Sequence, residues 1–292
     1  MAAHMVITGA GGQVGALLAG EAARRGHRVD ACAHRDFDIT DPAAAGARIR
    51  RDDIVVNCAA MTNVDHCESD RAGAFAVNAT GPENLARACA AVGARLIHLS
   101  TDYVFSGDLR RPYEISDATG PLSVYGHSKL AGESAVLAEL PDAHIVRTSW
   151  VYTGGSGSDF VAVMRRLAGG DGEIDVVDDQ IGSPTYAGDL VAALLEIADG
   201  GVRGPLLHVA NDGAVSRFEQ ARAVFAALGA NPDRIRPVHS AAFPRPAHRP
   251  VFSALSMAES VRAGLRPLRP WCDALLAALA VPLEDGPIPS KP

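Results

Sequence analysis

Tyr125 and Lys129 are the residues whose types and spacing most directly suggest a reaction in this sequence. They stand four positions apart, so a helix would place the phenol and the ammonium on one face. A nearby cation stabilises phenolate and lowers the pKa of a tyrosine from its reference of about 10, which lets the phenol exchange a proton with a carbonyl or an alcohol. The alternative is an exposed lysine beside a half-buried tyrosine, because this spacing is common by chance.

Two polar residues follow an apolar run over residues 94–100, which predicts a buried strand. They are Thr101 and Asp102, and they fall at the carboxyl end of that strand, where ligands bind in open α/β sheets. The Thr101 hydroxyl would hold a substrate oxygen beside Tyr125. The sequence therefore predicts a catalytic site formed by the end of this strand and the start of the helix that carries Tyr125.

A glycine-rich turn stands directly after the first expected strand and opens an Ala/Leu-rich helix; it reads Thr8-Gly9-Ala10-Gly11-Gly12-Gln13-Val14-Gly15. Gly9 allows the tight turn, Gly12 lets the backbone approach a pyrophosphate, and Gly15 lets helix and strand pack closely. The helix N-terminus offers free N–H groups to phosphates. A turn of this kind can also be purely structural, but its place at the start of an alternating strand and helix pattern favours a dinucleotide site.

The second expected strand leads into residues 33–38, where a dinucleotide fold recognises the adenosine ribose. Arg35 would pair with a 2′-phosphate, whereas Asp36 or Asp38 would bind the ribose or the adenine. A solvated loop is the alternative for each of the three.

Five apolar runs alternate with helical stretches, and this predicts a doubly wound parallel sheet, the Rossmann type of α/β fold. The expected strands cover residues 5–8, 28–33, 53–59, 94–100 and 144–152. A Gly/Ser-rich segment follows at 154–158. We therefore expect a dinucleotide-binding domain over 1–151 and a smaller C-terminal α/β substrate-binding domain over 152–292, some segments of which fold back onto the first.

Composition restricts the partners of the chain. With 27 Lys and Arg against 34 Asp and Glu it carries a formal charge of −7, and no basic cluster indicates nucleic-acid binding. No apolar run is long enough for a membrane helix, and the start lacks the features of a secretory signal, so we expect a cytoplasmic protein. The five cysteines form no C-x-x-C pair that would suggest zinc or redox chemistry.

The glycine turn, the strand-end hydroxyl and Y-x-x-x-K, in that order, resemble the extended short-chain dehydrogenases/reductases. Further segments sharpen the resemblance, over nearly the whole chain, to the dTDP-4-dehydrorhamnose reductase family; they are residues 57–65, 100–107, 147–152 and 177–185, and Arg249-Pro250 with Ser253 and Leu255. The resemblance implies reduction of the 4-keto group of dTDP-4-dehydro-L-rhamnose to dTDP-L-rhamnose, by NADPH or alternatively NADH. It also allows a homodimer and a magnesium ion, for which we identify no ligand.

Residue roles carry over from the resemblance. Tyr125 would supply the proton, Lys129 would hold the nicotinamide ribose and tune Tyr125, Thr101 and Asp102 would contact the sugar, and Trp150 would line the substrate site. The matching dinucleotide positions are Gly12, Gln13, Val14, Asp38, Ile39, Ala60, Met61 and Thr62. From its place in a Pro-rich segment, Arg249 is our candidate cation for the substrate pyrophosphate. The alternative for Trp150 is core packing.

Two departures from the family pattern stand out: Asp159 occupies a position that is often Asn, and Met61 replaces a more usual Tyr or His. Two other functions are also open. A sugar-nucleotide epimerase or dehydratase would share the glycine turn and Y-x-x-x-K, but a dehydratase needs a second acid where Tyr103 follows Asp102. A non-catalytic regulatory subunit could keep the reductase fold.

Overall fold

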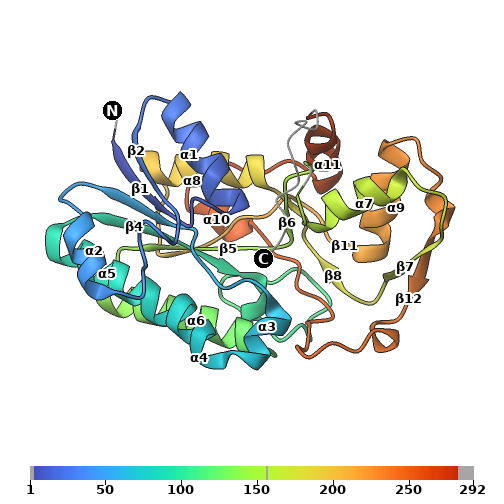
Figure 1. Cartoon of the computed structure of the whole chain (residues 1–292), viewed down its shortest axis with the longest axis horizontal. Coiled ribbons are helices and arrows are strands. Elements are labelled where there is room, and N and C mark those ends of the chain that lie inside the picture. The colour runs from blue at the N-terminus through green and yellow to red at the C-terminus, as the bar shows by residue number, and fades with distance from the viewer. Residues whose placement is uncertain (1–2, 156, 282–292) are drawn as a thin grey trace.

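The computed structural model describes residues 3–155 and 157–281. Its larger part is a parallel six-stranded sheet (Figure 1) with the strand order β10-β5-β4-β3-β1-β2. The strands are β1 (His4–Thr8), β2 (Arg28–Cys32), β3 (Ile54–Asn57), β4 (Arg95–Thr101), β5 (His144–Thr148) and β10 (Leu206–His208). The expected α/β class with a parallel sheet is confirmed.

One expected strand, over residues 144–152, is two strands in the structure. β5 ends at Thr148, and β6 (Val151–Tyr152) pairs instead with β9 (Thr185–Tyr186) outside the large sheet. Trp150 between them has φ +48°, a left-handed conformation that breaks an extended backbone. The continuous apolar pattern did not reveal this change of direction.

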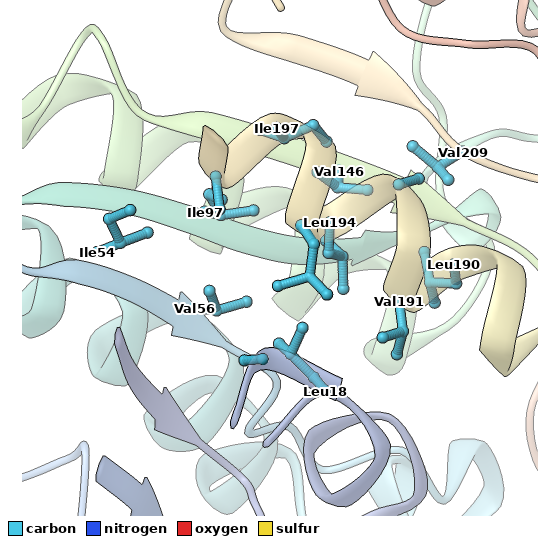
Figure 2. Packing of buried hydrophobic residues seen from close by; sticks show 14 of the residues in the cluster. Leu18, Ile54, Val56, Ile97, Val146, Leu190, Val191, Leu194, Ile197 and Val209 are labelled. Carbon is cyan, nitrogen blue, oxygen red and sulfur yellow. The ribbon is translucent and has the colours of Figure 1, made fainter. Parts of the chain in front are cut away.

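Helices cover both faces of the sheet, because the apolar side chains of its strands alternate between the faces. On one face, Met5 and Ile7 of β1 pack with α1 (Gln13–Arg24) and α8 (Ala187–Asp199). Figure 2 shows Leu18 of α1 and Leu194 of α8 in this cluster, together with Val56 of β3 and Ile97 of β4. This cluster is the larger apolar core of the molecule.

The opposite face of the sheet carries a second core, which starts from Val6 of β1. Its covering helices are α2 (Pro42–Arg48), α5 (Gly81–Val92) and α6 (Val124–Glu139). Shorter helices lead up to α5; they are α3 (Val64–Ser69), α4 (Arg71–Phe75) and the π-helical turn η1 (Ala76–Thr80). A 3-10 turn, η2 (Asp102–Val104), follows β4 directly.

A smaller mixed region lies beside the sheet (Figure 1) and has its own apolar cluster, which includes Tyr152 and Phe225. Its helices are α7 (Phe160–Ala168), α9 (Arg217–Ala227) and α11 (Trp271–Leu279). Its short strands are β7 (Ile174–Val177), β8 (Ile181–Gly182), β11 (Val215–Ser216) and β12 (Ile235–Val238), and two 3-10 turns, η3 (Pro232–Arg234) and η4 (Ser240–Ala242), flank β12.

The chain returns to the large sheet after residue 152. α8 packs against α1, β10 pairs with β5, and α10 (Ala258–Arg262) packs against β10. Segments of the expected second domain therefore pack on the first. The division into a cofactor-binding part, 1–151, and a substrate-binding part, 152–292, stays a proposal. Residue 156, in the expected Gly/Ser break, and residues 282–292 of the expected second domain lie outside the described residues. In the ranges that are described, no helix is long and apolar enough to cross a membrane.

Candidate active site

The glycine turn lies between the carboxyl end of β1 and the first turn of α1. Gly9 has φ +67°, and a Cβ there would stand 2.6 Å from the backbone nitrogen of Ala59. A Cβ on Gly15 would collide with the carbonyl oxygen of Gly9, so only glycine allows the helix this close approach. Gly12 is the N-cap of α1 and contributes no side-chain cap. The structure thus brings Gly9, Gly12, Gln13, Val14 and Gly15 into one turn whose leading N–H groups suit a phosphate.

In the loop after β2, Arg35 is exposed to solvent, whereas Asp38 is bound within its own turn. Arg35 is 88% exposed and lies 3.6 Å from Asp36. The Asp38 carboxylate instead accepts hydrogen bonds from the backbone N–H of Thr40 at 2.9 Å and from its hydroxyl at 2.8 Å, which lowers the pKa of Asp38. Ile39 beside it is buried. Arg35 is therefore free to meet a ligand phosphate, whereas Asp38 is engaged in its own turn.

Residues 60–62 follow β3 and are held by a residue that the sequence reasoning missed. Asn78, fully buried in the π-helical turn η1, accepts from the Met61 N–H at 2.9 Å and donates to the Met61 carbonyl oxygen at 3.0 Å. It also donates to the Ser128 hydroxyl of α6 at 3.0 Å. Asn78 therefore ties the expected cofactor segment of Ala60, Met61 and Thr62 to the helix that carries Tyr125 and Lys129. The available signal was a polar residue within the largely apolar stretch of residues 74–80.

Lys129 is 2% exposed, so the alternative of an exposed lysine is wrong. Its ammonium donates to the Leu99 carbonyl oxygen at 2.6 Å and lies 3.4 Å from His98 Nε2. The His98 ring is in turn held by Asn57, 2.9 Å away at Nδ1. Burial lowers the pKa of Lys129 to about 8, although Glu133 and Cys58 oppose the shift. Lys129 is thus fixed beneath the carboxyl end of β4.

Tyr125 lies in the first turn of α6, where Ser123 caps the helix by accepting from the Gly126 N–H at 3.2 Å. Its ring packs edge-on against Tyr103, with centroids 5.8 Å apart. Burial raises the pKa of Tyr125, and the Thr101 hydroxyl opposes that shift. The expected lowering by Lys129 is wrong for the chain by itself, because the ammonium is bound to Leu99 and desolvation disfavours phenolate.

Thr101 and Asp102 share a buried hydrogen-bond network at the end of β4. Thr101 donates to Asp102 at 3.1 Å and accepts from the Tyr103 N–H, also at 3.1 Å. The other Asp102 oxygen accepts from the Ser253 hydroxyl at 2.5 Å, which ties the second region to β4. Burial raises the pKa of Asp102 to about 6, against the lowering effect of its hydroxyl partners.

Trp150 faces a residue that the sequence analysis did not single out as functional. The guanidinium carbon of Arg217, the first residue of α9, lies 3.4 Å from the centroid of the Trp150 ring. Ser216 before it and Glu219 after it form a capping box, which the structure contains in full. The S-x-x-E spacing of residues 216–219 indicates a helix start, but nothing in the sequence indicates that Arg217 stacks on Trp150.

Arg249 forms an ion pair with Asp65 of α3. Its two terminal nitrogens donate to the two carboxylate oxygens at 3.2 and 3.0 Å, and these contacts lower the pKa of Asp65. Arg245 approaches the same carboxylate at 3.5 Å. The positive charge of Arg249 is therefore shared with a carboxylate.

The comparisons with known proteins agree with this geometry. The family described as RmlD substrate binding domain matches residues 3–282. A dTDP-4-dehydrorhamnose reductase of Mycobacterium tuberculosis is 63% identical over 289 residues, which cover 98% of this chain and 95% of that protein. The chain belongs to the dTDP-4-dehydrorhamnose reductase family.

Two crystal structures of the reductase family have the same fold. One, a dTDP-4-dehydrorhamnose reductase from Clostridium acetobutylicum, is 35% identical with a TM-score of 0.88, covering 94% of this chain and 98% of that one. The other, from Bacillus anthracis, is in complex with NADP; it is 36% identical with a TM-score of 0.88 and the same coverage. The parallel sheet and its smaller companion region are thus those of the reductase family.

The structure gives a local reason for Asp159, which departs from the reductase family pattern. One carboxylate oxygen caps α7 by accepting from the Ala162 N–H at 2.9 Å. The other accepts from the N–H and hydroxyl of Thr153, at 3.1 and 2.8 Å, and from the side chain of Gln13 at 3.2 Å. Four donors point at this carboxylate, so two acceptor oxygens serve better here than an amide.

Among the residues with a described placement, no group of three or more His, Cys, Asp or Glu could hold a metal ion.

Proposed function

We propose that this chain reduces the 4-keto group of dTDP-4-dehydro-L-rhamnose with NADPH and so forms dTDP-L-rhamnose. Family membership supports the proposal. The observation that carries it is the buried Lys129 and the Tyr125 phenol on one helix, α6, against the carboxyl end of β4. A regulatory subunit would not need to keep an ammonium buried at this position.

The cofactor part of the proposal rests on how the residues fit a dinucleotide. The glycine turn leaves the first N–H groups of α1 for a pyrophosphate, and Arg35 is exposed where a 2′-phosphate would lie. The Bacillus anthracis relative is in complex with NADP. When bound, NADPH would supply the hydride that reaches the carbonyl carbon. Ile39 and the segment of Ala60, Met61 and Thr62 are the remaining proposed contacts, with NADH as the alternative cofactor.

Tyr125 would donate the proton that the new hydroxyl needs. The phenol is protonated at neutral pH and can therefore give a proton to the reduced carbonyl oxygen. For Thr101 to donate a hydrogen bond to the same substrate oxygen, its hydroxyl proton would turn away from Asp102. Lys129 would hold the nicotinamide ribose through its ammonium, whose position the Leu99 carbonyl fixes.

Asp102, Trp150 and Arg249 would line the substrate side. Asp102 accepts hydrogen bonds and would orient sugar hydroxyls, while the other two lie where the second region meets the sheet. A homodimer, a cytoplasmic location and a magnesium ion without an assigned site remain predictions from the sequence.

A turnover assay tests the proposal. NADPH absorbance is followed with dTDP-4-dehydro-L-rhamnose and, separately, with UDP- and GDP-linked 4-keto sugars. We expect stoichiometric oxidation of NADPH with the dTDP sugar and slower turnover with the others. Binding of NADPH without turnover of any of them would indicate the regulatory subunit, and net dehydration or epimerisation would indicate the other enzyme classes.

A further inference from the structure

Arg217 is held flat against an aromatic surface at the base of α9. Its guanidinium carbon lies 3.4 Å from the Trp150 ring centroid and 4.9 Å from that of Phe160. Stacking of this kind fixes the plane of a guanidinium and leaves the N–H groups at its edge available for other partners. Within the described part of the chain, those groups make one side-chain hydrogen bond, from Nη1 to Gln220 at 3.2 Å.

The charge of Arg217 has no carboxylate within 4 Å among the described residues, in contrast to other arginines nearby. Arg147 is buried and donates two hydrogen bonds to Glu133, and Arg249 is paired with Asp65. Burial lowers the pKa of Arg217 to about 10, so it is still a cation at neutral pH. A half-buried cation that makes no direct contact with a carboxylate favours an anion that can reach it.

The surroundings of Arg217 belong to the substrate side of the site. Asp102, Tyr103 and Arg249 are the charged or titratable groups that act on it electrostatically. The expected 2′-phosphate position, after β2, is four strands away from β5 in the sheet order, or about 19 Å at the usual strand spacing. The anion that Arg217 meets is therefore not the 2′-phosphate of a dinucleotide.

We propose that Arg217, stacked on Trp150, binds the diphosphate of the nucleotide-sugar substrate and is its principal cation. This rests on the proposed function, because it takes the substrate class from there. A planar guanidinium presents parallel N–H groups to two phosphate oxygens, and the diphosphate carries the formal negative charges of a dTDP sugar. Trp150 then serves the substrate mainly as the platform of Arg217, and Arg249, which shares its charge with Asp65, contributes less.

Binding measurements on the whole chain test the proposal without turnover. Titration calorimetry compares dTDP with thymidine, which lacks the diphosphate, on the parent and on Arg217→Gln. Loss of a charge-assisted hydrogen-bond pair should raise the Kd of dTDP about 10- to 100-fold and leave that of thymidine within about twofold. Arg217→Lys should fall between the two, because it keeps the charge and loses the planar pair of donors.

Two controls separate a binding role from a structural one. Arg222→Gln removes an arginine of the same helix that is paired with Asp233, and it should bind dTDP like the parent. Titration with NADP checks that each variant keeps its first domain folded. If Arg217→Gln does not fold, Arg217→Lys carries the test: it keeps the charge and loses the planar pair of donors, so its Kd for dTDP should rise while its Kd for thymidine should not.

Three results would overturn the inference. A Kd of dTDP unchanged in Arg217→Gln would make the cation only a packing partner of Trp150. An equal loss for dTDP and thymidine would mean that Arg217 acts by shaping the nucleoside site. A parent chain that binds NADP but not dTDP would refute the proposed function itself, and the inference with it.

Discussion

Arg249 and Asp65 are 184 positions apart in the chain, yet their side chains form two hydrogen bonds of 3.0 and 3.2 Å. The pair joins the segment after β12 to α3, beside the large sheet. Asp65 also accepts from the Ala247 N–H at 3.2 Å, so the carboxylate holds both the backbone and the side chain of that segment. The same arginine is the proposed second cation of the substrate site.

This pair should be measurable as a coupling free energy. In a double-mutant cycle with Arg249→Ala and Asp65→Ala, urea unfolding should give a coupling of about 0.5–1 kcal/mol at neutral pH, since both side chains are partly exposed. Because Arg249 lowers the pKa of Asp65, the coupling should persist above the ordinary value of 3.8 and disappear as the pH falls through the folded-state pKa. Additive effects of the two substitutions at neutral pH would contradict it.

Replacement of Tyr125 by Phe should remove turnover and leave cofactor binding nearly intact. The change deletes the proton donor and keeps the ring that packs against Tyr103. We expect kcat to fall about 10²- to 10⁴-fold, with the Kd of NADPH unchanged. Tyr186→Phe is the matched control, because it removes a phenol hydroxyl in the second region. More than half of the parent rate in Tyr125→Phe would place the proton donor elsewhere.

Arg35→Ala should change the cofactor preference. Its side chain is 88% exposed, so the substitution removes little packing and chiefly a charge. The KM for NADPH should rise about tenfold or more, while the KM for NADH, which lacks the 2′-phosphate, should change little. The control is Arg51→Ala, an exposed arginine shortly before the start of β3, away from the strand ends that bind ligands. An equal effect of Arg35→Ala on both cofactors would place Arg35 away from the ribose.

Asp102→Asn should stabilise the fold above about pH 6. The folded chain holds a proton on Asp102 with a pKa of about 6, against 3.8 for an ordinary Asp, so it binds more protons than the unfolded chain between these values. Stability of the parent therefore falls as the pH rises through that window. The amide removes this loss and still accepts from Ser253.

The check is urea unfolding of parent and variant at about pH 4 and about pH 8. The advantage of Asp102→Asn should be roughly 1–3 kcal/mol larger at the higher pH. Asp108→Asn, at an exposed position, is the control, and its free energy of unfolding should equal that of the parent at both pH values. A difference that does not change with pH would show that Asp102 keeps an ordinary pKa.

The sequence by itself determined the features that depend on neighbouring residues. Nearly continuous apolar runs between helical stretches made the parallel strands recognisable. Gly9, Gly12 and Gly15 lie close together in the chain, within the turn after β1 and the first turn of α1, so their spacing was readable as well. The four-residue spacing of Tyr125 and Lys129 fixed their common helix, because helical geometry is the same wherever the helix packs.

Only the tertiary structure decided which groups meet across elements. Three such contacts depend on how helices and loops far apart in the chain pack together. They are Lys129 against Leu99, Arg217 on Trp150 and Arg249 with Asp65. The pKa of Tyr125 moved in the direction opposite to the local expectation for the same reason. Desolvation and charge pairing depend on every surrounding element, and a spacing of four residues carries no information about them.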